Sequence, residues 1–134
     1  MERRGAQLRL DMSSLMPAYR QVADQLRTFA VEGVIRPGDL LPPVRRLALE
    51  LGVHFNTIAE AYRVLAQEGF LGITHGHRAR VIDRTAPQHS DPTVVDAFRR
   101  RLRELIAGFR SSGMSAKKIA EELKTVAEGW EQRP

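Results

Sequence analysis

The chain has 134 residues, the size of one modest domain or of one domain with a small appendage. Its formal net charge is +5, a mild basic excess that suits binding to nucleic acid. A hydrophobic content of 43% is enough for a packed core, and the lack of cysteine excludes disulfides, thiolate metal sites and cysteine nucleophiles. Neither a signal peptide nor an apolar run near the roughly 18 residues of a membrane helix is recognisable, so we expect a cytoplasmic protein without membrane contact.

A first helix is predicted where one apolar face recurs at steps of 3, 4 and 3 residues, at Tyr19, Val22, Leu26 and Phe29. Ser14 is expected to cap this helix and Gly33 to end it. The preceding residues, 1–13, are polar and basic and predict a flexible arm, with a short strand at 7–10. Residues 40–41 predict a short strand that pairs with a later hairpin.

Residues 43–82 form the most informative stretch. A second helix is predicted to start at Pro43 and to bury Val44, Leu47, Ala48 and Leu51. Gly52 suits the sharp turn that follows, because glycine accepts a positive φ, and the small side chain of Ala48 allows a close approach. A third helix then runs to Gly69, with a buried face made of Ile58, Ala61, Tyr62 and Leu65.

Two β-like runs, FLGIT and RARVI, follow the third helix and flank the tip His75-Gly76-His77. The order helix, turn, helix, hairpin is that of a winged helix-turn-helix, which places one helix in the major groove of DNA and a basic hairpin beside it. Asn56 and Thr57, at the start of the third helix, are suited to meet base edges or phosphates. The alternative is that these two residues only cap the helix.

Beyond a linker at 85–92, an apolar stripe extends over two heptads, at Val95, Phe98, Leu102, Leu105 and Phe109. Ser115 is expected to cap a final helix that carries Ile119 and Leu123 on one side. Two helices of this size cannot form a core alone, so we expect them to pack against a second copy, the alternative being the chain's own first domain. The predicted class is α+β, mainly α: a winged helix-turn-helix domain at 1–84, the linker at 85–92 and a two-helix dimerisation tail at 93–134.

Other chemistry finds little support in the sequence. No catalytic triad, carboxylate pair or phosphate-binding loop is present, so we expect no enzyme and no cofactor. His75 and His77 share a β-like run, but a metal site needs further ligands, so contact with phosphate or water is the preferred interpretation and no metal is expected. A winged helix also serves as a protein-interaction module in some proteins, and this is the alternative to DNA readout.

Three segments resemble the GntR family of bacterial transcription regulators: MPAYRQVADQLR (16–27), GVIRPGDLLPPVRRLALELGV (33–53) and NTIAEAYRVLAQEGFL (56–71). The short two-helix tail resembles the YtrA-type subgroup, whose members dimerise through such a tail and lack a larger effector-binding domain. The resemblance implies a repressor that binds an inverted-repeat operator on double-stranded DNA as a homodimer. It identifies no small-molecule effector, because the tail leaves little room for a pocket apart from the dimer cleft.

The resemblance also implies residue roles: Arg45 reaches a phosphate or a guanine edge, Asn56 and Thr57 begin the recognition helix, and His75 and Gly76 form the wing tip. This chain departs from the family at Phe55, where arginine or proline is common, which reduces polar contacts with bases. The full set expected to contact DNA is Arg45, Arg46, His54, Phe55, Asn56, Thr57, Arg63, His75, Gly76, His77, Arg78 and Arg80. The set expected to form the dimer is Val95, Phe98, Leu102, Leu105, Phe109, Ile119 and Leu123.

Overall fold

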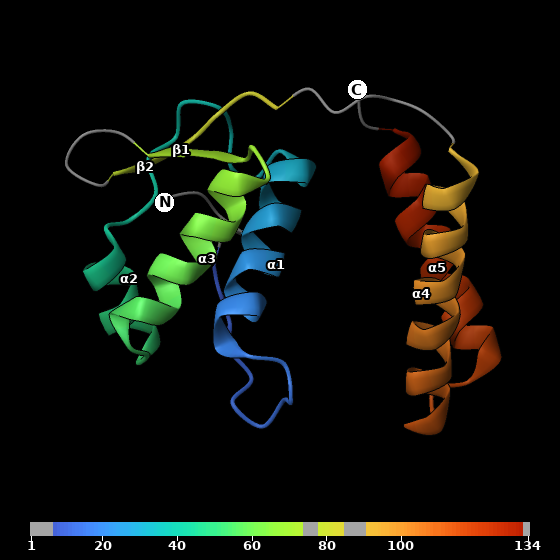
Figure 1. Cartoon of the computed structure of the whole chain (residues 1–134). Helices are drawn as coiled ribbons and strands as arrows, with labels where there is room; N and C mark the ends of the chain where they lie inside the picture. Colours follow the sequence, from blue (N-terminus) through green and yellow to red (C-terminus); the bar gives the residue numbers. More distant parts are fainter. Residues whose placement is uncertain (1–6, 74–77, 85–90, 133–134) are drawn as a thin grey trace. The chain divides into compact units, whose positions relative to one another are not determined.

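The computed structural model describes residues 7–73, 78–84 and 91–132, and the chain forms two compact units, Met1–Ala86 and Pro87–Pro134. The first unit contains three helices, α1 (Ala18–Glu32), α2 (Val44–Leu51) and α3 (Phe55–Gln67), and the strands β1 (Leu71–Ile73) and β2 (Ala79–Val81) (Figure 1). The second unit contains α4 (Pro92–Ser111) and α5 (Ala116–Glu131). The predicted fold class, a mainly helical winged helix-turn-helix followed by two helices, is therefore confirmed.

Helix α3 packs against both α1 and α2 and forms the centre of the first unit. Its inward face is the predicted one, because Ile58, Ala61, Tyr62 and Leu65 are all at most 3% exposed. They join one apolar cluster with Val22, Ala23 and Leu26 of α1, Leu47 and Ala48 of α2, and Phe70, Leu71, Ala79 and Val81 at the hairpin. This burial leaves only the opposite side of α3 open to solvent.

The turn between α2 and α3 depends on Gly52, which has a φ of 69° as predicted. The amide of Val53 then donates to the carbonyl of Ala48 at 3.0 Å, which closes the turn. Gly33 ends α1 in the same left-handed conformation, again as predicted. The expectation for Ser14 was wrong: α1 begins after Pro17 without a side-chain cap, and the Ser14 hydroxyl accepts from the Met16 amide at 3.1 Å inside the preceding turn.

The wing is a short antiparallel hairpin in which Leu71 pairs with Val81 and Ile73 with Ala79. The strand predicted at 40–41 is reduced to a single bridge between Leu40 and Arg80, reinforced by a 2.9 Å hydrogen bond from the Leu41 amide to the Ala79 carbonyl. The predicted wing tip, His75-Gly76-His77, lies outside the described residues.

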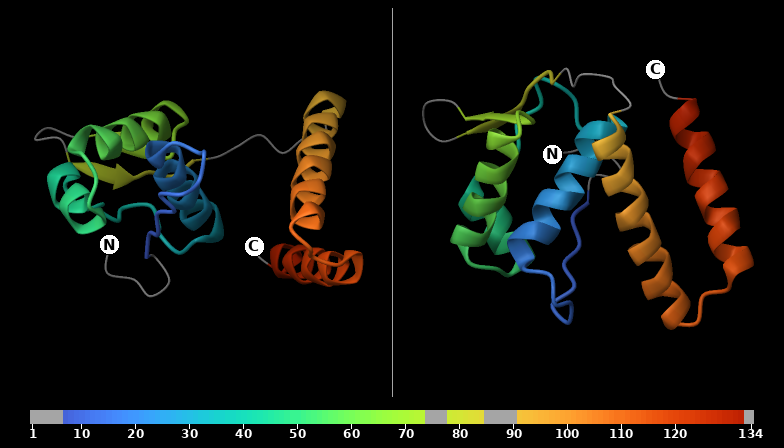
Figure 2. Two further views of the ribbon diagram at one scale, coloured as in Figure 1. Left: turned by 90° about the horizontal axis from the view of Figure 1, so that it is seen from below. Right: turned by 45° about the vertical axis from the view of Figure 1, so that its right-hand side comes forward.

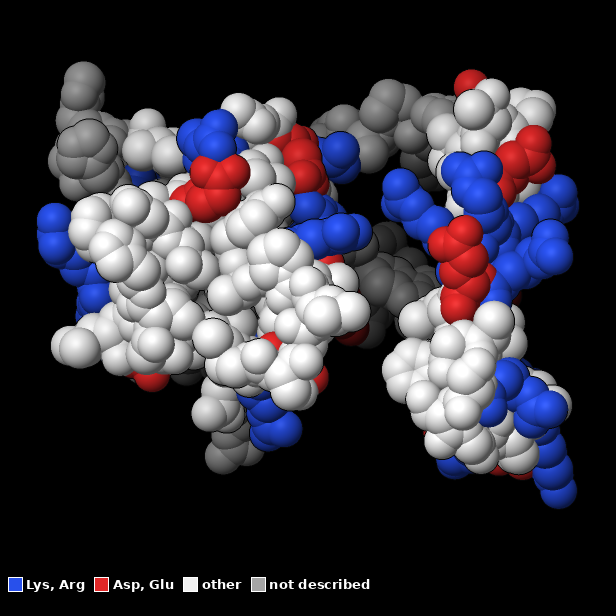
Figure 3. Space-filling view, turned by 60° about the horizontal axis from the view of Figure 1, so that its bottom comes forward, with Lys and Arg blue, Asp and Glu red and all other residues white. Residues whose placement is uncertain are grey.

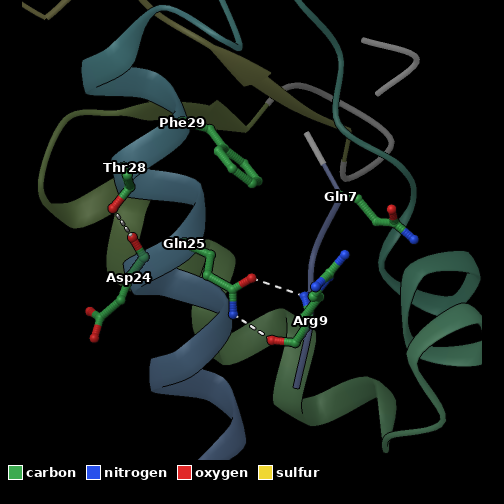
Figure 4. A pocket seen from close by; sticks show the side chains of 6 residues that line it. All are labelled: Gln7, Arg9, Asp24, Gln25, Thr28 and Phe29. Atoms are coloured by element: carbon green, nitrogen blue, oxygen red, sulfur yellow. Dashed lines mark hydrogen bonds between the residues drawn. The ribbon is translucent and has the colours of Figure 1, made fainter. Parts of the chain in front are cut away.

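Within the predicted flexible arm, residues 8–11 are instead tied to α1. Leu8 is 7% exposed and belongs to the core. The Gln25 side chain accepts from the Arg9 amide at 2.9 Å and donates to the Arg9 carbonyl at 2.6 Å (Figure 4). Gln21 holds the backbone of Asp11 in the same way, at 2.8 and 2.9 Å. No strand forms at 7–10, because side-chain amides, and not another strand, take up these backbone groups.

In the second unit, α4 and α5 spread apart from the turn that joins them (Figure 2). Ser115 caps α5 as predicted, accepting from the Lys118 amide at 3.0 Å, and Asp91 caps α4 by accepting from the Thr93 amide at 2.8 Å. Among the described residues of this unit only Ile119 is buried, at 8% exposure. Asp91 and Pro92, at the end of the predicted linker, thus already belong to the start of α4.

Tyr62 provides a test of the α3 packing. Its hydroxyl donates to the Pro42 carbonyl at 2.7 Å, and burial raises the pKa of this phenol well above its usual value near 10. The neutral form is therefore favoured in the folded state, so the stability that Tyr62 contributes is present below about pH 10 and is lost as the pH rises above that value. Tyr62→Phe should lower the free energy of unfolding by about 0.5–2 kcal/mol at neutral pH, because the Pro42 carbonyl loses its partner.

Urea denaturation followed by circular dichroism measures this change. The Tyr62→Phe variant should also lose less stability than the wild type between neutral pH and about pH 10.5. Tyr19→Phe is the control, since Tyr19 is half-buried and its hydroxyl makes no hydrogen bond within the described part of the chain. An equal alkaline loss in wild type and Tyr62→Phe would contradict this account.

Candidate nucleic-acid interface

Three side chains form a stack where the exposed sides of α2 and α3 begin. The Arg45 guanidinium lies over the Phe55 ring, 4.5 Å from its centroid, and the His54 ring stacks on Phe55 with centroids 4.6 Å apart. We call Arg45, His54 and Phe55 the Arg–Phe–His stack. Such a cation–π contact at an exposed site contributes about 0.5–1 kcal/mol, enough to bias the orientation of a long arginine side chain.

His54 is also the cap of α3, because its Nδ1 accepts a hydrogen bond from the Asn56 amide at 3.1 Å. That nitrogen therefore carries no proton in this arrangement. The alternative that Asn56 and Thr57 serve only as helix caps is wrong, since His54 performs that role. Asn56 is exposed and Thr57 half-buried, and neither side chain makes a hydrogen bond within the described residues, so both remain suited to contact a ligand.

The arginines of the expected interface differ in how their charge is compensated. Arg46 lies 3.1 Å from Glu50, and Arg63 is hydrogen-bonded to Glu60, which raises the pKa of Arg63. Both pairs are solvent-exposed, and such pairs contribute only about 0–1 kcal/mol, so a phosphate can replace the carboxylate at little cost. Arg45 has no carboxylate within 4.0 Å among the described residues, so its charge is fully available.

Arg78 and Arg80 place further positive charge at the base of the wing. Both are exposed, and Arg80 donates to the Gly38 carbonyl at 3.2 Å. Burial is the main cause of the raised pKa of Tyr62, and the positive charge of Arg78 lowers this pKa. Arg78 is therefore close enough to α3 for its charge to act on Tyr62, on the inward face of that helix. His75, Gly76 and His77 lie outside the described residues.

The structure gives Phe55 a role that the sequence did not indicate, because its ring contacts the side chain of Arg45. From the sequence, Phe55 was expected only to reduce the polar contacts with bases. In the structure it is 37% exposed and organises the side chain of Arg45. No periodic pattern links the first turn of α2 to that of α3, so the sequence contained no signal for this contact.

Other candidate sites are weaker. A hollow of about 480 Å³ lies between the amino-terminal segment and α1, and it is lined by Gln7, Arg9, Asp24, Gln25, Thr28 and Phe29 (Figure 4). None of these residues belongs to the expected DNA-contacting set. The described residues include no group of three or more His, Cys, Asp or Glu placed to hold a metal ion. Within the same residues, no helix has the length and apolar character needed to cross a membrane.

Comparison with known proteins places this geometry in context. The sequence pattern of the bacterial regulatory proteins, gntR family, matches residues 18–81. The HTH-type transcriptional repressor YtrA of Bacillus subtilis (strain 168) is 28% identical over 120 residues, covering 90% of this chain and 92% of that protein. The uncharacterized HTH-type transcriptional regulator YhcF of the same organism is 30% identical over 121 residues, covering 87% and 94%.

Among solved structures, YtrA from Sulfolobus acidocaldarius, a GntR-family transcription factor, is similar with a TM-score of 0.56 and 32% identity. This match covers 80% of the present chain and 98% of that one. These similarities extend past the first unit and into the tail.

Arg45 gives the most direct test of the interface. Arg45→Ala should weaken binding to a duplex selected by the wild-type protein by about 1–3 kcal/mol, because the variant lacks an uncompensated arginine that meets a base or phosphate. The variant should still unfold cooperatively with at most a few degrees' loss in Tm, since Arg45 is exposed and loses only the cation–π contact with Phe55. Arg20→Ala removes a cation from α1 and should bind as the wild type does. Unaltered affinity of a folded Arg45→Ala variant would remove Arg45 from the interface.

The wing is tested through the salt dependence of binding. Changing Arg78 and Arg80 to Ala should weaken binding to all duplexes similarly, and the slope of log K against log salt should fall by about one for each phosphate that is no longer neutralised. Thermal unfolding of this variant must be checked, because Arg80 also binds the Gly38 carbonyl. Lys117→Ala with Lys124→Ala, which removes two charges from α5, is the control. A change in sequence preference with an intact salt slope would contradict a backbone-contacting wing.

Proposed function

The chain belongs to the GntR family of bacterial regulatory proteins and is a DNA-binding transcription regulator, and we propose that it acts as a homodimeric repressor on an inverted-repeat operator. The proposal of repression rests on the Bacillus subtilis relative, which is named a transcriptional repressor and aligns along nearly the whole chain. A regulator of this kind acts in the cytoplasm, where bacterial DNA lies. The alternative of a winged helix without DNA readout is not favoured by this family membership.

The Arg–Phe–His stack is the observation that carries the DNA-binding mode. Recognition helices read bases mainly with their amino-terminal residues, and the stack lies at that end of α3. We therefore assign α3 to the major groove and the wing to the neighbouring backbone or minor groove. The proposed contacts are Arg45, Arg46, His54, Phe55, Asn56, Thr57, Arg63, His75, Gly76, His77, Arg78 and Arg80.

The exposed apolar face of the tail supports the dimer. Phe98, Leu105 and Phe109 of α4 are 64%, 56% and 53% exposed. On α5, Leu123, Val126 and Trp130 are between 39% and 55% exposed, and much of the tail surface in Figure 3 is uncharged. Burying a Leu or Phe side chain contributes about 1.5–3 kcal/mol, so covering this face is favoured.

A second copy is the simplest occupant, because a two-fold axis lets the same apolar face cover itself. The proposed seam comprises Val95, Phe98, Leu102, Leu105, Phe109 and Leu123. Ile119, which the sequence also placed in the seam, is already buried within its own chain, at 8% exposure, and so has little surface left for a partner. Such a dimer presents two α3 helices to two half-sites.

The tail is tested by placing charges in the seam. Phe98→Asp with Leu105→Asp should yield a monomer in sedimentation at micromolar concentration, because an unpaired buried charge costs several kcal/mol. Specific DNA binding should fall much further than non-specific binding. The control, Ala107→Asp with Ser111→Asp, puts the same charges on the opposite side of α4 and should remain dimeric.

Footprinting of the wild-type protein on a selected duplex completes this test. Two protected half-sites should lie about one helical turn apart, roughly 10 base pairs from centre to centre. A double variant that remains dimeric would show that the seam lies elsewhere. A single, unrepeated half-site in the footprint would contradict the inverted repeat.

A further inference from the structure

We propose that Phe55 recognises the 5-methyl group of a thymine in each half-site, and that this thymine is adjacent to the guanine that the family resemblance lets Arg45, held against Phe55, reach. This inference rests on the proposed placement of α3 in the major groove. It adds one base, a thymine, and its position next to the Arg45 contact, which the proposed function alone does not supply.

The exposed part of Phe55 is apolar and lies where α3 begins. The ring has no hydrogen-bonding group, and its contacts with Arg45 and His54 leave 37% of the residue exposed. Most base-edge groups in the major groove donate or accept hydrogen bonds. An apolar ring displaces the water bound to these groups and offers no hydrogen bond in its place, which is unfavourable. The methyl group of thymine is the one feature there that gains from an apolar neighbour.

Arg45 is already oriented before DNA binds. Its guanidinium lies 4.5 Å from the centroid of the Phe55 ring and has no carboxylate partner within the described residues. Ordering a free arginine side chain costs conformational entropy, so a stacked arginine binds with a smaller entropic cost. The planar fork of arginine matches the O6 and N7 acceptors of guanine.

The contact between Arg45 and Phe55 limits how far apart the two DNA bases that they meet can lie. Because Arg45 and Phe55 touch, the groups they meet in the groove must also be neighbours. Successive bases in one strand are separated by about 3.4 Å along the helix axis, which is comparable to the 4.5 Å between the guanidinium and the ring centroid. The half-site should therefore contain a thymine and a guanine in adjacent base pairs.

The first step of the test is selection of bound duplexes from a random pool by the full-length protein. Each thymine of the selected site is then replaced in turn by uracil, which lacks only the 5-methyl group. One thymine per half-site should show a loss of about three- to fivefold, as expected for about 0.8 kcal/mol from one buried methyl group. In a dimer that binds two half-sites, replacing both should cost roughly ten- to twentyfold.

The variant Phe55→Ala identifies the group responsible. It should bind more weakly overall and should no longer distinguish thymine from uracil at that position, whereas Phe55→Leu, still apolar, should retain part of the distinction. Leu49→Ala is the matched control: Leu49 is 84% exposed on α2, so the same kind of truncation there should leave the thymine-to-uracil ratio unchanged. Circular dichroism verifies folding of each variant.

The guanine is tested with 7-deazaguanine, which lacks the N7 acceptor. This replacement next to the methyl-sensitive thymine should weaken the wild type and leave Arg45→Ala unaffected. Uracil that is tolerated at every thymine, or an unchanged thymine-to-uracil ratio in Phe55→Ala, would overturn the inference. If no sequence is enriched from the pool at all, sequence-specific binding itself fails, which is a distinguishable result.

Discussion

The packing of one side of α3 against α1 and α2 is the constraint on which the proposed DNA surface depends. Ile58, Ala61 and Leu65 are almost completely buried, so α3 cannot rotate about its axis without exposing the core. Tyr62 adds a directional bond from the same face to the Pro42 carbonyl, just before α2 begins. The exposed side of α3 is therefore determined by what its buried side requires.

Both ends of α3 are also held. At its start, His54 caps the first turn and stacks with Phe55. At its end, Glu68 accepts two hydrogen bonds from Arg27 of α1, at 2.7 and 2.8 Å, and this pairing lowers the pKa of Glu68. Arg84 donates to the Glu68 carbonyl at 2.8 Å and lies over the Phe70 ring, so the chain leaves the first unit from an anchored position. The orientation of α3 and the position of Arg84 are thus both fixed relative to the core.

Periodicity and glycine placement predicted the three helices of the first unit, the turn at Gly52 and the capped helix after Ser115, because these depend on local sequence. The flexible arm predicted at 1–13 was wrong for residues 8–11, because the side-chain amides of Gln21 and Gln25 hold their backbone, and no local pattern indicates these partners. The contact of Arg45 with Phe55 was missed for a similar reason, as it forms only after the turn brings two helices together. The apolar stripe of the tail was visible in the sequence. That α4 and α5 bury little of it against each other could be seen only in the structure.

The central claim is that the open side of α3, together with the base of the wing, meets DNA. Titration of ¹⁵N-labelled protein with a selected duplex, followed by amide chemical shifts, tests it most directly. The account predicts the largest changes at Arg45, at residues 54–57, at Arg63 and at 78–80, with little change at the buried residues of α1. Changes confined to the outer side of α1 or to α5, with residues 54–57 unaffected, would contradict it.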